Sequence, residues 1–187
     1  IERLRITIII FRIQYAKVER WKPPIDLADE QFPHDSYDAT TFGPCCPQPV
    51  THVHIPSQDE QCLYLNIYKP DLPTNHSSLP VFVYIHGGAH NHGCSSIGVP
   101  YLYNGTNIIT HSPPDQPVIV ITINYRLGVL ADMFLEELIE EDPQWPTAGN
   151  YMYLDMLSAL RWIQTNIEDY GGDRTNVRLF GQSAGGL

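Results

Sequence analysis

The feature that most constrains this chain is the motif Gly181-Gln182-Ser183-Ala184-Gly185, which directly follows a short apolar run at residues 177–180. A chain that passes from strand to helix within one residue forces the central serine into a strained conformation and crowds its neighbours. Glycines at both ends of the motif remove the side chains that would clash. The motif therefore predicts a sharp elbow (residues 181–185) that holds the Ser183 hydroxyl clear of a sheet, with Ser183 as the candidate nucleophile.

A second glycine-rich turn, His86-Gly87-Gly88-Ala89, follows the apolar run at residues 81–85. Attack of a serine on an acyl carbonyl creates an oxyanion, which backbone N–H groups stabilise. One such group follows the nucleophile, and the others come from a turn after a neighbouring strand. We therefore expect Gly88, Ala89 and Ala184 to form an oxyanion hole. Each turn taken alone would also fit an ordinary loop, but the strand before it favours the catalytic interpretation.

Three short β-rich runs, at residues 62–68, 81–85 and 118–123, each end in a turn. The last two are apolar throughout, which is typical of strands in a sheet that is covered on both faces. Residues 151–168 change to a helical period, and Gly171 and Gly172 end the helix before the strand at 177–180. A helical stripe is formed by Leu154, Leu157, Leu160, Arg161, Ile163 and Ile167. This βαβ pattern predicts the α/β class, with a mostly parallel central sheet and flanking helices. The acidic residues 136–145 are predicted to be a surface excursion.

The formal net charge is −10 at pH 7, and 43% of the residues are hydrophobic. This composition is typical of a globular protein. The acidic balance argues against a nucleic-acid partner, because neutralising phosphates requires clustered lysine and arginine. No apolar run approaches the roughly 20 residues that cross a bilayer. The longest, at residues 6–11, predicts a buried first or edge strand; a badly predicted exon boundary is the alternative, and a small-residue cleavage site for a signal peptide is lacking.

Four cysteines stand at positions 45, 46, 62 and 94, and two Asn-x-Ser/Thr sequons begin at Asn75 and Asn104. Both asparagines lie among turn-forming residues, where a glycan acceptor should lie. Sequons in loops together with nearby cysteines favour an oxidising, secretory compartment. We therefore expect a secreted or extracellular-facing protein that is glycosylated at Asn75 and Asn104.

His86, His90 and His92 stand close together and raise the question of a metal site. The spacing H-x-x-x-H-x-H would need a helix or a tailored loop, and no neighbouring carboxylate or thiolate completes a ligand set. We therefore expect a polar loop beside the glycine-rich turn, with neither metal nor cofactor. His90 is close enough to the turn to contact a substrate.

Taken together, these motifs resemble the type-B carboxylesterase and cholinesterase-like family over nearly the whole chain. The matching stretches are Arg20-Trp21-Lys22-Pro23-Pro24; Glu60-Gln61-Cys62-Leu63-Tyr64-Leu65-Asn66; His86-Gly87-Gly88-Ala89; Asn124-Tyr125-Arg126-Leu127-Gly128; Gly149-Asn150-Tyr151; Ala159-Leu160-Arg161-Trp162-Ile163; and Phe180-Gly181-Gln182-Ser183-Ala184-Gly185-Gly186. Seven matches in order are far more specific than a single pentapeptide.

The resemblance implies an α/β-hydrolase fold, of which residues 1–187 form the N-terminal part of a single carboxylesterase type-B domain, ending just after the elbow. It also implies a triad of serine, Asp or Glu, and histidine, with the acid and the histidine downstream of Ser183. All eight histidines precede Ser183. Residues 1–187 by themselves are therefore expected to be inactive, because Ser183 lacks a base.

By the same resemblance, Cys46 is expected to bond Cys62. A loop of about 15 residues closed in this way contributes on the order of 3 kcal/mol in the chain-entropy model. Cys45 and Cys94 have no assigned partner. The resemblance also implies two buried structural ion pairs, Arg20 with Glu60 and Arg126 with Asp155.

The departures from the family pattern bear on the substrate. Gln61 replaces the usual Asp, and Ala89 replaces the usual Gly, which leaves the backbone donor intact. Gln182 replaces the commoner Glu and so removes a negative charge that would favour a cationic substrate. The loop between Cys46 and Cys62 contains no Trp, so the aromatic platform that holds choline is missing. Acetylcholine is therefore not expected as a substrate.

Two hypotheses follow. The first is a secreted serine carboxylesterase that acts on a small-molecule carboxylic ester through an acyl-enzyme intermediate. The alternative is a catalytically silent adhesion or scaffold domain, because fold does not fix function and the stretch Pro146-Thr147-Ala148-Gly149-Asn150-Tyr151 is similar to some arthropod members of that kind. Silent relatives usually lose the nucleophile, and this chain keeps it, which favours the enzyme.

Overall fold

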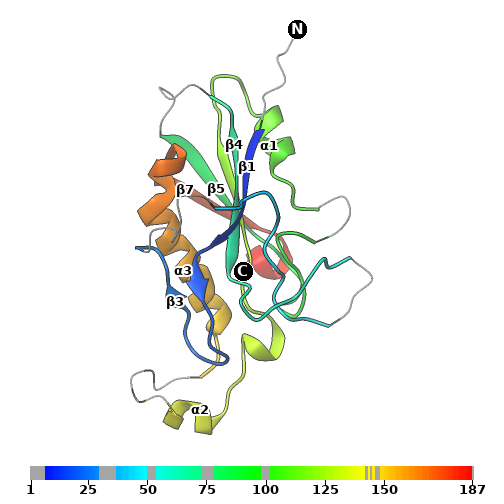
Figure 1. The fold of residues 1–187 in the computed structure, drawn as a ribbon, viewed down its shortest axis with the longest axis vertical. Coiled ribbons are helices and arrows are strands. Elements are labelled where there is room, and N and C mark those ends of the chain that lie inside the picture. The colour runs from blue at the N-terminus through cyan, green and yellow to red at the C-terminus, as the bar shows by residue number, and fades with distance from the viewer. Residues whose placement is uncertain are drawn as a thin grey trace.

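The computed structural model describes residues 7–29, 37–49, 54–72, 78–97, 102–141, 143, 145 and 148–186. These residues form a five-stranded sheet with helices beside it (Figure 1), which confirms the predicted α/β class. In spatial order the strands are β1 (Thr7–Gln14), β4 (Tyr64–Pro70), β6 (Ile119–Ile123), β5 (Leu79–Ile85) and β7 (Gly172–Gly181). A separate ribbon pairs β2 (Ala16–Lys17) with β3 (Ile25–Asp26). The α-helices are α1 (Thr106–His111), α2 (Glu136–Glu141) and α3 (Tyr151–Asn166), and the 3₁₀ turns are η1 (Gly128–Leu130), η2 (Ile167–Tyr170) and η3 (Ser183–Gly186).

The sheet is mixed rather than mostly parallel. Strand β5 pairs in parallel with both β6 and β7, whereas β4 pairs antiparallel with both β1 and β6. The βαβ spacing predicts the parallel part, but the earlier runs carry no signal of strand direction, because side chains alternate between the faces in either arrangement. In the parallel part, both glycine-rich turns lie at the carboxyl ends of strands, where open α/β sheets bind their ligands.

Helices α3 and α1 lie on opposite sides of the sheet (Figure 1). Val81 and Val83 of β5 belong to the main core together with Trp162 of α3. The alternate residue Phe82 packs against a smaller cluster that contains Ile109 of α1. Strand β6 is buried along its whole length, as predicted for a strand covered on both faces. Every second residue of β5 remains only partly buried, so β5 is well covered on one face only.

Helix α3 spans nearly the predicted range, but its buried face differs from the predicted leucine stripe. Leu157 is 48% exposed, whereas Asp155 and Ser158 are buried. These polar residues are inside because each has a partner there: Asp155 pairs with Arg126, and Ser158 donates a hydrogen bond to Asp26. A hydrophobic period ranks side chains by apolarity alone and therefore misses a buried polar residue that is paired.

Strand β1 is the edge strand predicted from the apolar run near the N-terminus, but the expectation that it is buried is wrong, because Ile13 is its only buried residue. It pairs antiparallel with β4, and the register shifts between Ile10 and Ile13. At this irregularity Arg12 adopts a positive φ of 60° and donates its backbone N–H to Asn66 Oδ1 at 3.1 Å. The side chain of Asn66 therefore satisfies the backbone N–H of Arg12 at this irregularity.

Two disulfides cross-link the irregular segment before β4. One joins Cys46 to Cys62, 16 residues apart, which is the pair implied by the family resemblance. The other joins Cys45 to Cys94, 49 residues apart, and so pairs the two cysteines that the sequence leaves without partners. All four cysteines of the chain are therefore bonded.

The two expected ion pairs both form, but only one is buried. The side chains of Arg126 and Asp155 are 2% and 0% exposed. Those of Arg20 and Glu60 are 55% and 34% exposed, so the expectation that this second pair is buried is wrong. The segment around Arg20 passes over the outside of the fold, where water competes with the ion pair.

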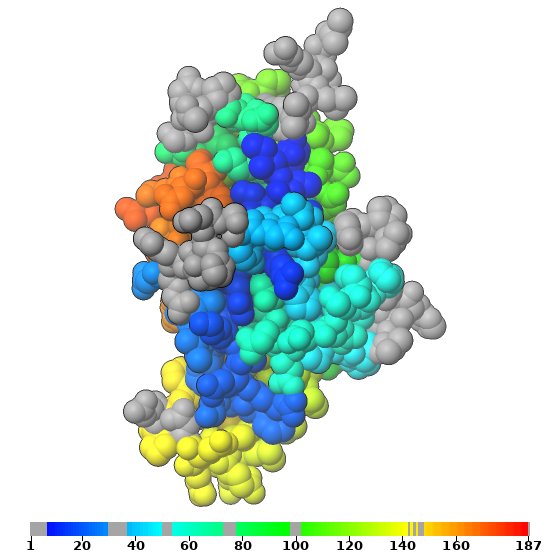
Figure 2. Space-filling view, in the orientation of Figure 1, coloured from blue at the N-terminus to red at the C-terminus, as the bar shows by residue number. Residues whose placement is uncertain are grey.

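The acidic excursion contains the short helix α2, which has no buried residue and lies at one end of the molecule (Figures 1 and 2). In Figure 2 the N-terminal segments, coloured blue to cyan, occupy much of the side toward the viewer. In the part of the chain that the structure describes, no helix has both the length and the apolarity to cross a membrane.

Candidate active site

The elbow places Ser183 at the end of β7 with a left-handed backbone, φ 53°. The residue is exposed. A Cβ atom on Gly181 would lie 2.0 Å from the carbonyl oxygen of Gly185, and one on Gly185 would lie 2.2 Å from the carbonyl oxygen of Ile85. Neither distance is possible for a real Cβ atom, so the steric reason given for the two glycines holds. A short 3₁₀ turn, η3, begins at Ser183 within the elbow.

The glycine turn (residues 86–90) packs directly against the elbow. A Cβ atom on Gly87 would lie 2.4 Å from the backbone oxygen of Gln182 and 3.1 Å from Cβ of Ser183. Gly88 has φ 117°, Ala89 φ 53° and His90 φ 58°, so three successive residues have positive φ. Such backbone costs of order 1–3 kcal/mol for each non-glycine residue and persists only where contacts hold it.

Several hydrogen bonds hold this strained turn. The carbonyl oxygen of Gly88 accepts from the backbone N–H groups of Asn91 at 3.0 Å and His92 at 3.1 Å. The carbonyl oxygen of His90 accepts from the backbone N–H of Gly128 at 2.7 Å. The turn is therefore fixed both within itself and to the segment after β6.

The ring of His86 lies beneath the turn and is completely buried. It stacks on Tyr125, with ring centroids 4.3 Å apart and 15° between the planes. Its Nδ1 donates to the carbonyl oxygen of Gly87 at 2.9 Å, since a carbonyl can only accept. The Tyr125 hydroxyl donates to the carbonyl oxygen of His86 at 2.6 Å. The pKa of His86 is lowered to about 4, chiefly by burial; the bond to Gly87 opposes this shift, and neighbouring His92 and His90 add to it.

We expect the stability of the full-length protein to fall by about 3 kcal/mol between pH 7 and pH 4 because of His86 alone. Below its ordinary pKa of 6.5, His86 takes up a proton in the unfolded chain but stays neutral in the folded one until about pH 4. Stability from this residue is therefore complete above pH 6.5 and is lost as the pH falls. Urea unfolding at half-unit pH steps measures how the free energy of unfolding changes with pH. The slope should be smaller in His86→Phe than in the wild type. An equal slope in both proteins would contradict the assignment of this pH dependence to His86.

The neighbouring histidines do not share a common centre. His90 Nε2 lies 3.2 Å from the carbonyl oxygen of Ala184, and His92 lines the pocket beside Ser183. No group of three or more potential metal ligands is present among the described residues. The ring of His90 turns toward the backbone of the elbow, and contact of His90 with a substrate stays a prediction.

A pocket of about 420 Å³ opens beside Ser183. Ile97, Leu102 and Tyr103 supply its apolar wall. The lining contains no carboxylate among the described residues; the rest of it consists of Gly87, Gly88, Ala89, His92, Gly93, Gln182 and Ser183. An uncharged group is therefore suited to this space.

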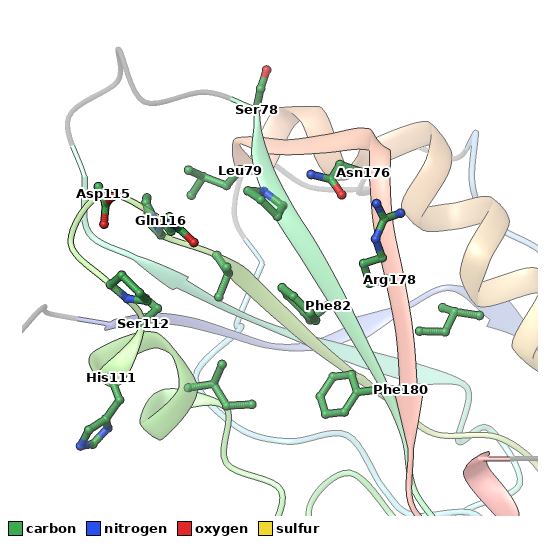
Figure 3. Close-up of a pocket in the computed structure, with 16 residues that line it drawn as sticks. Ser78, Leu79, Phe82, His111, Ser112, Asp115, Gln116, Asn176, Arg178 and Phe180 are labelled. Atoms are coloured by element: carbon green, nitrogen blue, oxygen red, sulfur yellow. The ribbon is translucent and has the colours of Figure 1, made fainter.

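A larger pocket, about 1,090 Å³, lies along β5 and β7 and extends to the ends of these strands that lie away from the elbow (Figure 3). Phe82 and Phe180 both line it and meet edge to face, with ring centroids 6.2 Å apart. Ser78, Leu79 and Asn176 stand at one end of it. Since neither Ser183 nor the glycine turn lines this pocket, the smaller pocket is the candidate active site.

Sequence reasoning missed two residues that support the site. Gln48 accepts from the backbone N–H of Gly93 at 2.8 Å and donates to its carbonyl oxygen at 2.9 Å, which fixes the end of the loop after the glycine turn. Asn124 accepts from Ser95 N–H at 2.9 Å and donates to the carbonyl oxygen of Pro44 at 3.0 Å. Both residues connect segments far apart in sequence, so no local spacing signals them.

Of the two sequon asparagines, Asn104 is described by the structure and Asn75 is not. Asn104 is exposed, and its Oδ1 accepts from the backbone N–H of Thr106 at 2.9 Å. Asn75 lies outside the described residues. Glycosylation at either position stays a prediction.

Comparisons with known proteins show the family and the fold of the chain. A family model described as the carboxylesterase family matches residues 8–187. Para-nitrobenzyl esterase of Bacillus subtilis (strain 168) is 38% identical over 182 residues, which cover 94% of this chain and 34% of that protein. Carboxylesterase 1C of Mus musculus is 38% identical over 163 residues, covering 80% and 26%. Among solved structures, a thermophilic pNB esterase matches with a TM-score of 0.80 at 38% identity, covering 96% of this chain and 35% of the other. The chain thus spans about a third of the length of these relatives or less.

Proposed function

This chain belongs to the carboxylesterase family, and from that premise we propose that the full-length protein hydrolyses small-molecule carboxylic esters with Ser183 as its nucleophile. The observation that carries the proposal is the left-handed Ser183, exposed at the carboxyl end of β7 with the glycine turn packed against it. A strained and exposed serine beside a turn of backbone amides is the arrangement that acyl transfer requires.

In the proposed reaction, Ser183 Oγ adds to the ester carbonyl carbon while its proton passes to a histidine base. The oxyanion accepts hydrogen bonds from the backbone N–H groups of Gly88, Ala89 and Ala184. The carbonyl then re-forms, and the alcohol leaves with the proton from the histidine. A water molecule repeats these steps on the acyl-enzyme, which releases the acid and restores Ser183.

The base and its acidic partner belong, in this proposal, to the part of the full-length protein that corresponds to the remaining two-thirds of the relatives. The three histidines near the elbow support this placement. The ring of His86 is buried beneath the glycine turn, His90 contacts the Ala184 carbonyl, and His92 is one of the residues that line the pocket. No hydrogen bond joins any of them to Ser183 among the described contacts.

An uncharged ester is the proposed substrate class. Gln182 stands beside Ser183 in the pocket with a neutral amide, and the apolar wall of Ile97, Leu102 and Tyr103 suits an acyl or alcohol chain. A cation would lose its water shell there without gaining a carboxylate partner from the described lining. The two disulfides further support folding in an oxidising compartment, and we propose secretion on that ground.

A fluorophosphonate probe tests the function. An activated serine hydroxyl displaces fluoride from such a probe and keeps the phosphonyl group. We expect the folded full-length protein to take up label on the peptide that contains Ser183, and Ser183→Ala to take up none. Heat-denatured protein serves as the control for non-specific reaction. A folded full-length protein without label would contradict the hydrolase proposal and favour the silent adhesion or scaffold role.

A further inference from the structure

We propose that His90 is a positioning residue for the proposed reaction: it ties the glycine turn to the elbow and so fixes the spacing of the oxyanion donors. The proposal rests on the proposed function. Two of the three proposed donors, Gly88 and Ala89, belong to the glycine turn, and the third, Ala184, belongs to the elbow. Their spacing therefore depends on a contact between two separate segments.

The side chain of His90 makes such a contact. Its Nε2 lies 3.2 Å from the carbonyl oxygen of Ala184. A carbonyl oxygen can only accept, so Nε2 carries the hydrogen and donates it. The bond joins the residue next to Ala89 to the donor residue Ala184 itself, across 94 positions of sequence. The bond holds the peptide between Ala184 and Gly185, which directly follows the peptide that carries the Ala184 N–H.

The surroundings of His90 leave its ring little freedom. The ring makes edge contacts with Tyr125, at 6.4 Å between centroids, and with Tyr153, at 6.1 Å. The backbone of His90 has φ 58°, and its carbonyl oxygen accepts from Gly128 N–H at 2.7 Å. Both the main chain and the side chain of this residue are therefore held. Because His90 is fixed in this way, it restrains the backbone of the strained turn that precedes it.

His90 does not line the pocket beside Ser183. Its loss should therefore change the stabilisation of the transition state and leave substrate binding nearly unchanged. Removing one oxyanion donor lowers kcat by about 10²–10³-fold in measured cases. Loosening donors that remain present should cost less, and we expect about 10- to 100-fold.

The test compares His90→Phe with His90→Gln in the full-length enzyme, with p-nitrophenyl butyrate as substrate. Phenylalanine keeps a flat ring between the tyrosines but donates no hydrogen bond, whereas glutamine keeps an N–H donor of similar reach. We expect His90→Phe to lower kcat by about 10- to 100-fold with KM within about threefold, and His90→Gln to recover most of kcat. A trifluoromethyl ketone, whose adduct with serine carries the oxyanion, should bind more weakly to His90→Phe by a similar factor.

Unchanged kcat and unchanged ketone affinity in His90→Phe would overturn the proposal while leaving the hydrolase function standing. A wild-type enzyme that neither hydrolyses the ester nor takes up fluorophosphonate would instead overturn the function, and this proposal with it. If His90→Phe does not fold, His90→Met replaces it, because Met and Gln have nearly the same length and differ in the donor. Equal kcat in the Met and Gln variants would then overturn the positioning role.

Discussion

Replacing Gly87 by alanine is expected to lower kcat of the full-length enzyme for p-nitrophenyl butyrate by about 10³-fold. The new Cβ atom would lie 2.4 Å from the backbone oxygen of Gln182 and 3.1 Å from Cβ of Ser183. The first distance is too short for any real Cβ contact, and the atom it meets is backbone, so the turn and the elbow must move apart. Such a movement separates Ser183 from both proposed oxyanion donors of the glycine turn, Gly88 and Ala89, at the same time.

Gly186→Ala is the matched control for this prediction. A Cβ atom on Gly186 would have its nearest neighbour, the carbonyl oxygen of Gly181, at 3.4 Å, which is ordinary van der Waals contact. The same chemical change, three residues after Ser183, should leave kcat within about threefold of wild type. Steady-state kinetics on both variants, with circular dichroism to verify folding, measures the difference. A Gly87→Ala enzyme with nearly full kcat would show that the close approach of the two turns is not needed for catalysis.

How well the sequence predicted the site depends on how local each feature is. The elbow could be predicted from the spacing of Gly181, Ser183 and Gly185, because a Cβ atom on Gly181 would clash within the motif itself, with the carbonyl oxygen of Gly185. The left-handed backbone of Ser183 belongs to the same turn. The clash at Gly185 is with Ile85 and the clash at Gly87 is with Gln182, so the packing of the two turns against each other appears only in the fold.

Features that depend on distant partners could not be predicted from local patterns. Gln48 supports Gly93 from 45 residues away, and nothing in the sequence near either residue marks the contact. The burial of Asp155 depends on Arg126 from a separate segment, so the apolar period selected Leu157, and only the family resemblance implied this ion pair. The pairing of Cys45 with Cys94 likewise became evident only when the fold brought the two segments together.

Replacing Asp155 by leucine is expected to destabilise the full-length protein by about 3–5 kcal/mol. Arg126 donates to both carboxylate oxygens of Asp155, from NH2 at 2.7 Å and from Nε at 2.9 Å. It also donates from NH1 to the carbonyl oxygen of Lys22 at 2.7 Å and stands over the ring of Tyr151 at 5.1 Å. Without Asp155, a guanidinium with a side chain only 2% exposed remains charged in the interior. Urea unfolding followed by tryptophan fluorescence measures the loss.

The double variant Arg126→Met/Asp155→Leu separates the loss of the ion pair from the cost of an unpaired charge. We expect it to be more stable than Asp155→Leu alone, because no buried charge is left without a partner, although the carbonyl oxygen of Lys22 loses its donor. Arg20→Met is the surface comparison: its partner Glu60 stays partly exposed to water, so the change in the free energy of unfolding should be far smaller. Two results would contradict the assignment of Arg126 and Asp155 as the buried ion pair on which this part of the fold depends. One is a loss of stability in the double variant that equals the sum of the losses in the two single variants. The other is a loss in Arg20→Met as large as that in Asp155→Leu.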